Sequence, residues 1–238
     1  MNMNDYLNSY QNRSDNTALG TRTSQVMKRV YVKMFLGMLV TAFTALWCYQ
    51  SGSVMSFFMA HPGAMWGAFI AELILVFAIS GGINKMSSGT ATLLFYLFAI
   101  VNGVALFPIF MVYTHVSIAK TFFITAATFG AMSVYGYCTS QDLSKWGSIL
   151  FMALIGLIIC CVINIFWANS AFEWIISIAG VLIFVGLTAW DTQKIKQMAS
   201  MTSTESYGKL ATLGALTLYL DFINLFLFLL RFFGNARD

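Results

Sequence analysis

Long apolar runs separated by short polar connections make up the chain from residue 29 onward. Each run approaches the ~20 apolar residues that an α-helix needs to cross a bilayer. Seven such helices are expected, near residues 29–50, 63–81, 90–113, 118–138, 146–168, 172–192 and 210–233. Because the connections are short, successive helices should run antiparallel. The pattern predicts an all-α fold, that of a polytopic membrane protein built as a seven-transmembrane-helix bundle.

The composition supports this class of protein. Of the 238 residues, 59% are hydrophobic and only 9% are charged, whereas soluble globular domains carry about 25% charged residues. A chain of this size cannot bury so much apolar surface in water, so the lipid bilayer is its expected surroundings. Residues 1–28 are rich in Asn, Ser, Thr, Gln and Asp and are expected to form a flexible tail. Residues 29–238 then form one seven-helix membrane domain.

The distribution of basic residues predicts which end of each helix faces the cytoplasm. Lysine and arginine gather in cytoplasmic loops, and ten of them precede the first span or lie in alternate loops on the same side: Arg13, Arg22, Lys28, Arg29, Lys33, Lys85, Lys145, Lys194, Lys196 and Lys209. Only Lys120, Arg231 and Arg237 fall opposite. The N-terminus and the tail are therefore expected in the cytoplasm. A re-entrant seventh segment would fit the charge rule slightly better, but this segment is long enough to span, and a full crossing is expected. Because the charges lie between spans, the net charge of +4 gives no reason to expect a nucleic-acid partner.

One carboxylate interrupts the most apolar stretch near the end of the chain. Leu218–Gly234 reads LYLDFINLFLFLLRFFG, and Asp221 lies within it. Thr217 and Asn224 fall on the same helical face as Asp221. An ionisable group at bilayer depth costs at least about 2.5–3.5 kcal/mol, so it must face a partner or water rather than lipid. This helix, which is apolar on nearly all sides but must hide Asp221, is expected near the bundle centre.

Two further acidic residues lie in or beside apolar segments. Asp191 ends the sixth segment, and with Ser177 and Thr188 it forms a weakly polar face on that helix. Two antiparallel neighbours that each carry a polar face and one aspartate should turn those faces toward each other. Contact between Asp191 and Asp221 requires the sixth helix to dip inward or the seventh to begin early, near 203–207, and the second arrangement is predicted. Alternatively, Asp191 is a solvated helix-end residue.

Glu72 lies midway along the second span. It is expected either to belong to an ion pathway or to form an interhelical hydrogen bond, for example with Asn102 or Asn164. Asn102, Asn224 and Thr217 are the other polar candidates for such a pathway.

If Asp191 and Asp221 meet, their chemistry is specific. Two carboxylates in contact at low dielectric cannot both ionise cheaply, so one proton is held between them. The protonated pair would tie the last two helices together, and the ionised pair would repel and attract a cation. The chain contains no H-E-x-x-H, P-loop or G-x-S-x-G motif. It is therefore not expected to be an enzyme or to carry a cofactor.

Several segments resemble the Bax inhibitor family, also called the transmembrane Bax inhibitor motif family, and most closely its bacterial inner-membrane members. They are LYLDFINLFLFLLRFFG, VGLTAWDTQKIKQM, GALTLYL, FMALIGL and FGAMSVYGY, and the resemblance covers about residues 20 to 236. It implies seven helices with the last one central, and a pH-sensitive calcium leak whose sensor aspartates match Asp191 and Asp221. The family's second-helix glutamate matches Glu72. A structurally studied relative has an arginine latch at the end of that helix. Here the sequence is GGINKMS, so the arginine cannot be carried over, and Lys85, the nearest cation, is the candidate for that latch.

The function expected from these features is a calcium-permeable leak channel in a bacterial inner membrane, gated by protonation of the aspartate pair. Calcium prefers about 6–8 oxygen ligands, so Asp191 and Asp221, even with Glu72, would bind it only weakly and transiently. One alternative is a non-transporting protein that regulates stress responses or membrane-protein turnover through other membrane proteins. Another is an intramembrane aspartyl protease, although the G-x-G-D motif is missing before Asp221.

Overall fold

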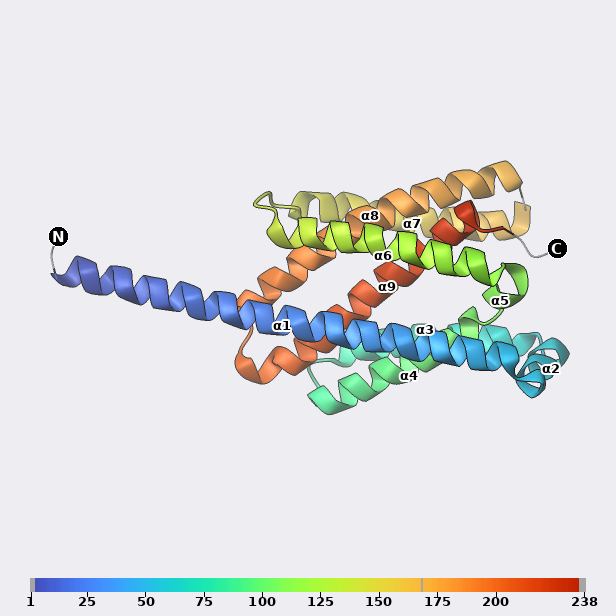
Figure 1. The fold of residues 1–238 in the computed structure, drawn as a ribbon, viewed down its shortest axis with the longest axis horizontal. Coiled ribbons are helices and arrows are strands. Elements are labelled where there is room, and N and C mark those ends of the chain that lie inside the picture. The colour runs from blue at the N-terminus through green and yellow to red at the C-terminus, as the bar shows by residue number, and fades with distance from the viewer. Residues whose placement is uncertain (1–2, 168, 236–238) are drawn as a thin grey trace.

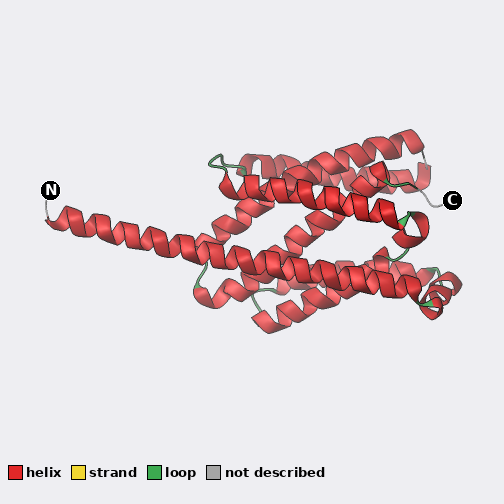
Figure 2. Cartoon of the chain, viewed as in Figure 1, coloured by secondary structure: helices red, strands yellow, loops and turns green. Residues whose placement is uncertain are grey.

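The structure is a computed structural model that describes residues 3–167 and 169–235, with side chains from residue 20 onward except that of Thr204. Apart from the connections between helices, this part of the chain is α-helical (Figures 1 and 2). Its elements in order are α1 (Met3–Gln50), α2 (Gly52–Ala60), α3 (Gly63–Gly82), α4 (Ser88–Leu106), α5 (Ile109–Val112), α6 (His115–Cys138), α7 (Ser144–Trp167), α8 (Ser170–Met201), the 3-10 turn η1 (Thr204–Ser206) and α9 (Tyr207–Phe233). Seven helices in this part are long and apolar enough to cross a membrane. The predicted fold class is thereby confirmed.

Local sequence signals start several of these helices. The side chains of Ser87, Thr114 and Asn169 accept hydrogen bonds from the first turns of α4, α6 and α8. These side-chain oxygens satisfy backbone N–H groups that have no partner inside the helix. Pro108 lacks an N–H and separates α4 from the short helix α5. The third predicted span is thus a long helix followed by one extra turn.

The helices form two groups with α9 between them. Figure 1 shows α6 and α7 with the first part of α8 on one side, and α1, α3 and α4 on the other. The helix α9 runs obliquely through the middle and contacts α8, α1, α6, α4 and α3. In its most apolar stretch, 72% of the residues are buried, against 39% at most in any other span. The central position expected for the last helix is confirmed.

Two boundaries differ from the sequence prediction. The first helix begins at Met3, and Thr23, Val26 and Met27 are already buried in the core. The boundary at residue 28 is therefore too late, because these residues pack against the bundle; the expected tail also includes residues 1 and 2, which lie outside the described residues. The sixth span continues past residue 192 to Met201. Its extra turns are polar yet helical, and they carry Asp191 away from the helix end.

The last helix is continuous over 27 residues. This length corresponds to about 40 Å at 1.5 Å per residue, which is ample for a bilayer. The start of α1 and the end of α9 lie at opposite ends of the structure in Figure 1. The helix therefore has the form of a full crossing, with no break of the kind that a re-entrant segment needs.

Candidate functional site

Asp191 on α8 and Asp221 on α9 face each other inside the bundle. Their carboxyl groups lie within hydrogen-bonding reach of each other, and the side chains are only 7% and 5% exposed. A carboxylate has no proton to donate, so a hydrogen bond between two carboxyl groups requires that one of them be protonated. The contact expected from the polar faces of these two helices is present, and Asp191 is not a solvated helix-end residue.

The geometry of the α8–α9 hairpin brings the two carboxyl groups to one level. Asp191 lies ten residues before the end of α8, and Asp221 lies fourteen residues after the start of α9. At 1.5 Å per residue, both are roughly 15–20 Å from the hairpin turn. Because α9 begins at Tyr207, close to the predicted 203–207 region, and α8 extends to Met201, neither helix has to dip inward.

Close packing beside Asp191 holds α8 in place. A side chain at Gly136 of α6 would collide with the backbone of Ala189 on α8. On the same flank of α8, Ser133 and Thr192 place their hydroxyl oxygens 3.3 Å apart. The small residues of α6 thus let the two helix backbones approach at the level of the aspartate pair, as small residues do in membrane bundles.

The polar surroundings of the pair are sparse. Asp221 Oδ2 is fully buried and has no hydrogen-bond donor among the described residues. The cation that acts electrostatically on Asp191 is Lys194, one turn along the same helix. Its amine lies 4.6 Å from the centre of the Trp190 ring. A buried carboxyl oxygen without a hydrogen-bond partner destabilises a static core. Binding of a proton, a water molecule or a cation at this oxygen would therefore stabilise the site.

Lys85 is the residue predicted as a cation latch. It lies exposed in the connection between α3 and α4, and its amine has no hydrogen bond or ion pair within the described part of the chain. The same connection is held instead by Lys209 of α9, whose amine donates to the carbonyl of Asn84 at 3.2 Å. The cation that acts electrostatically on Asp191 is Lys194 on its own helix, so the latch at Lys85 stays a prediction.

Glu72 belongs to a second polar cluster, formed by α1, α3, α4 and α9. Asn102 Nδ2 donates to Glu72 Oε1 at 2.7 Å, and the Tyr219 hydroxyl donates to Asn102 Oδ1 at 2.8 Å. The Thr41 hydroxyl lies 2.6 Å from the Tyr219 oxygen and donates to the carbonyl of Ala99 at 2.8 Å. Of the two partners considered for Glu72, the structure selects Asn102. We call these four side chains the Tyr219 network.

The Tyr219 network and the aspartate pair lie on opposite faces of α9. Tyr219 and Asp221 are two residues apart, which corresponds to about 200° around a helix. Tyr219 packs edge-on against Phe95 and Phe98 of α4, whereas Asp221 meets α8. The central helix therefore carries one polar contact toward each half of the bundle.

Within the described structure, two predicted polar candidates on α9 make only local bonds. The Thr217 hydroxyl donates to the carbonyl of Leu213, and the Asn224 amide donates to that of Leu220. Both acceptors are backbone atoms one turn earlier in the same helix. The polar face that these residues share with Asp221 in sequence does not join them to the pair by hydrogen bonds.

Sequence reasoning missed two polar residues of the core. Tyr219 was part of an apolar run, and its hydroxyl gave no periodic signal. Lys33 was counted only for orientation, yet its amine donates to Thr92 Oγ1 at 2.7 Å and to Thr212 Oγ1 at 2.6 Å. Its place one turn inside an apolar segment is a signal that could have identified it, because a lysine there needs internal acceptors.

The described residues contain no group of three or more His, Cys, Asp or Glu side chains that could hold a metal ion. The aspartate pair alone offers the oxygens of two carboxyl groups, fewer than the about 6–8 that calcium prefers. What the pair can do is exchange a proton and attract a cation transiently.

Comparisons with known proteins agree on one family. The family profile described as "Inhibitor of apoptosis-promoting Bax1" matches residues 23–238. The chain is 48% identical over 214 residues to the inner membrane protein YbhL of Escherichia coli, covering 89% of this chain and 92% of that protein. It is 44% identical to an uncharacterized protein of Borreliella burgdorferi over 90% of this chain and 94% of that one. It is 40% identical to the uncharacterized protein RP147 of Rickettsia prowazekii over 99% of this chain and 100% of that one.

Proposed function

Because the chain belongs to the Bax inhibitor family, we propose that it is a calcium-permeable leak channel of a bacterial inner membrane whose gate is the Asp191–Asp221 pair. The observation that carries the proposal is the buried contact between these two carboxyl groups on the last two helices. The inner-membrane location is supported by the relationship to YbhL, which is described as an inner membrane protein.

The gate works through the charge of the pair. With one or both protons bound, the carboxyl groups hydrogen-bond and hold α8 against α9. When the pair loses its protons, the two negative charges repel at short range in a medium of low dielectric. Separation of the helices then admits water and cations, and the carboxylates attract a divalent ion. Weak binding suits conduction, because an ion that binds tightly does not leave.

The test is calcium entry into proteoliposomes as a function of pH. In the parent, flux is expected to fall as pH falls, because protonation restores the tie between α8 and α9. In the Asp191→Asn/Asp221→Asn variant, the amides stay neutral at every pH, so flux should stay low and independent of pH. Asp142→Asn is the matched control: this exposed carboxylate lies outside the spans, and hydrogen bonds from Ser144 lower its pKa. A double variant that keeps the parent's pH response would overturn the gate.

The aspartate contact also favours a second candidate, an intramembrane aspartyl protease, because that chemistry needs two carboxyl groups sharing a proton. The discriminating measurement is cleavage of a membrane substrate by the purified protein. Cleavage that is lost in either single Asp→Asn variant would support the protease, and calcium flux without cleavage would support the channel.

The alternative of a non-transporting regulator makes a different prediction. It requires that a deletion strain be complemented by the double Asp→Asn variant even when that variant no longer conducts calcium in a pH-dependent way. Complementation and flux that are lost together would favour the channel.

A further inference from the structure

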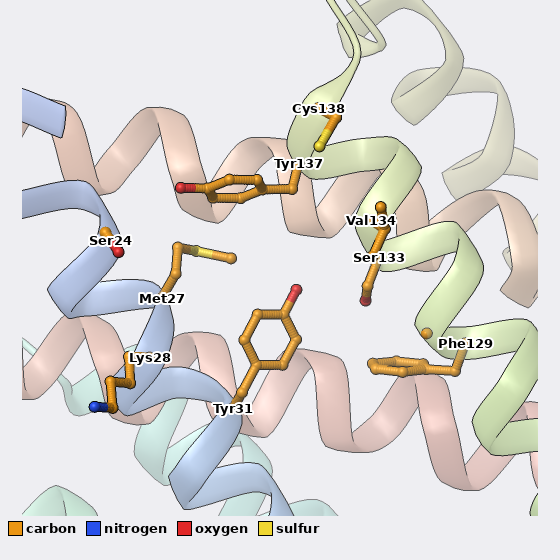
Figure 3. A pocket seen from close by; sticks show the side chains of 10 residues that line it. Ser24, Met27, Lys28, Tyr31, Phe129, Ser133, Val134, Tyr137 and Cys138 are labelled. Carbon is orange, nitrogen blue, oxygen red and sulfur yellow. The ribbon is translucent and has the colours of Figure 1, made fainter. Parts of the chain in front are cut away.

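A hollow between α1 and α6 opens the side of the bundle (Figure 3). Its volume is about 550 Å³, and its lining is largely apolar, with Met27 and Tyr31 from α1 and Phe129, Gly130 and Val134 from α6. Figure 3 shows the side chains of Tyr31 and Tyr137 reaching into the space between the two helices. We call this space the α1–α6 groove.

The outer surface of α1 beside the groove is basic. A second hollow, of about 390 Å³, lies along Gln25, Lys28, Arg29, Val32 and Lys33. Lys28 lines both hollows, and in Figure 3 its amine turns away from the α1–α6 groove. The amine of Lys33 is already bonded to Thr92 and Thr212, so Lys28 and Arg29 are the cations available to a ligand. None of the described residues that line either hollow is acidic.

The depth of this region matches the edge of the bilayer. A hydrocarbon core about 30 Å thick needs about 20 residues of helix. Counted back from the end of α1 at Gln50, that length reaches about Tyr31. Lys28 and Arg29 therefore lie at the level of lipid headgroups, and the groove residues Tyr31, Phe129 and Val134 lie at or just inside the hydrocarbon edge.

From this arrangement we propose that the α1–α6 groove binds an anionic phospholipid, with an acyl chain in the groove and the phosphate at Lys28 and Arg29. An apolar hollow in this position faces lipid tails rather than water. Lys28 lines both this groove and the neighbouring hollow that contains Arg29, and no acidic residue lines either one. These two cations therefore select a negatively charged headgroup over a zwitterionic one. The Tyr31 hydroxyl inside the groove is placed to donate a hydrogen bond to an ester carbonyl of the same lipid.

Native mass spectrometry of the purified full-length protein, with equal amounts of phosphatidylglycerol and phosphatidylcholine in detergent, tests the headgroup part. The parent should retain phosphatidylglycerol in preference. Each of the changes Lys28→Gln and Arg29→Gln should lower that preference about fivefold. Lys85→Gln and Lys145→Gln, which remove exposed cations elsewhere, should leave it unchanged. An equal loss in these controls would mean general surface attraction and would overturn the site.

Filling the groove tests the acyl-chain part. A side chain at Gly130 would meet nothing within 4 Å, so Gly130→Leu should occupy the groove without disturbing the fold and should reduce lipid retention. Gly156→Leu on α7 is the control, because that position is equally open. A second test is Val134→Trp in the groove, which should also reduce lipid retention. Its control is Val116→Trp at the other end of α6, because the two valine side chains are similarly exposed, at 63% and 62%.

Glycerol 3-phosphate separates a lipid site from a simple phosphate site. It carries the charge without acyl chains, and it should not displace phosphatidylglycerol from the parent. Displacement by glycerol 3-phosphate, or unchanged retention in both Gly130→Leu and Val134→Trp, would show that no acyl chain lies in the groove and would overturn the proposal.

Discussion

The two faces of the central helix α9 differ in how fully their buried polar groups are hydrogen-bonded. On one face, the Tyr219 network joins four helices, and each of its side chains has a hydrogen-bond partner. On the other face, the aspartate pair rests on one carboxyl–carboxyl contact, and Asp221 Oδ2 has no hydrogen-bond donor among the described residues. A satisfied network specifies one arrangement of helices, whereas a half-satisfied pair changes its energy whenever a proton arrives or leaves. The contrast leads us to expect that α9 stays fixed to α1, α3 and α4 and that the proposed gate movement occurs against α8.

The largest expected effect on stability comes from breaking the Tyr219 network at its centre. Asn102→Leu keeps the size of the side chain but removes the hydrogen-bond partner of Glu72 and one of the two partners of Tyr219. Since each buried polar group left unsatisfied costs about 1–3 kcal/mol, the unfolding free energy should fall by roughly 2–4 kcal/mol. Thermal unfolding in detergent measures this, with Asn224→Leu as control because that amide bonds only to its own helix. Equal losses in the two variants would contradict the role of the network.

A smaller effect is expected from Tyr219→Phe. The ring keeps its packing against Phe95 and Phe98, and only the hydroxyl contacts with Asn102 and Thr41 are lost. The expected destabilisation is about 1–2 kcal/mol. Tyr207→Phe is the matched control, because the buried Tyr207 hydroxyl has no hydrogen-bond partner in the described structure. Tyr207→Phe should leave the free energy of unfolding unchanged or raise it. A loss equal to that of Tyr219→Phe would mean that the hydrogen bonds of the Tyr219 hydroxyl do not contribute to stability.

On the other face, Asp221→Asn should change stability by less than about 1 kcal/mol near neutral pH, because the amide can donate to Asp191 in place of the shared proton. Its main effect should be on pH dependence. The folded parent holds a proton in the pair that the unfolded chain releases, so its stability should rise as pH falls through the mildly acidic range. In the variant this slope should shrink. Unfolding midpoints at mildly acidic and mildly alkaline pH measure it, and an unchanged slope would mean that the pair does not share a proton.

The smallest effect is expected from Thr217→Ala and Asn224→Ala. Both side chains bond to carbonyls of their own helix, so the free energy of unfolding should change by no more than about 0.5 kcal/mol. Calcium flux should also keep its pH response. If either change lowered flux as strongly as the loss of the aspartates, these residues would have to line the ion path.

The periodicity and the length of the apolar runs were sufficient to predict the seven helices, the central place of the last one and the approach of Asp191 to Asp221. The reason is that a carboxylate cannot face lipid. Two acidic side chains on neighbouring antiparallel helices are therefore expected to face each other. The same reasoning limited Glu72 to an interhelical partner and included Asn102 among the candidates.

What only the tertiary structure decided was the pairing of polar groups whose sequence neighbours are apolar. Tyr219 becomes part of a network because Thr41 of α1 and Asn102 of α4 reach its hydroxyl, and Asn102 in turn bonds to Glu72 of α3. Among the described residues, Thr217 and Asn224 donate only to carbonyls of their own helix. Lys85 remains exposed while Lys33 turns inward between Thr92 and Thr212. A helical face can be read from spacing alone, but the atoms opposite that face belong to segments far away in sequence, and their positions depend on how the whole bundle packs.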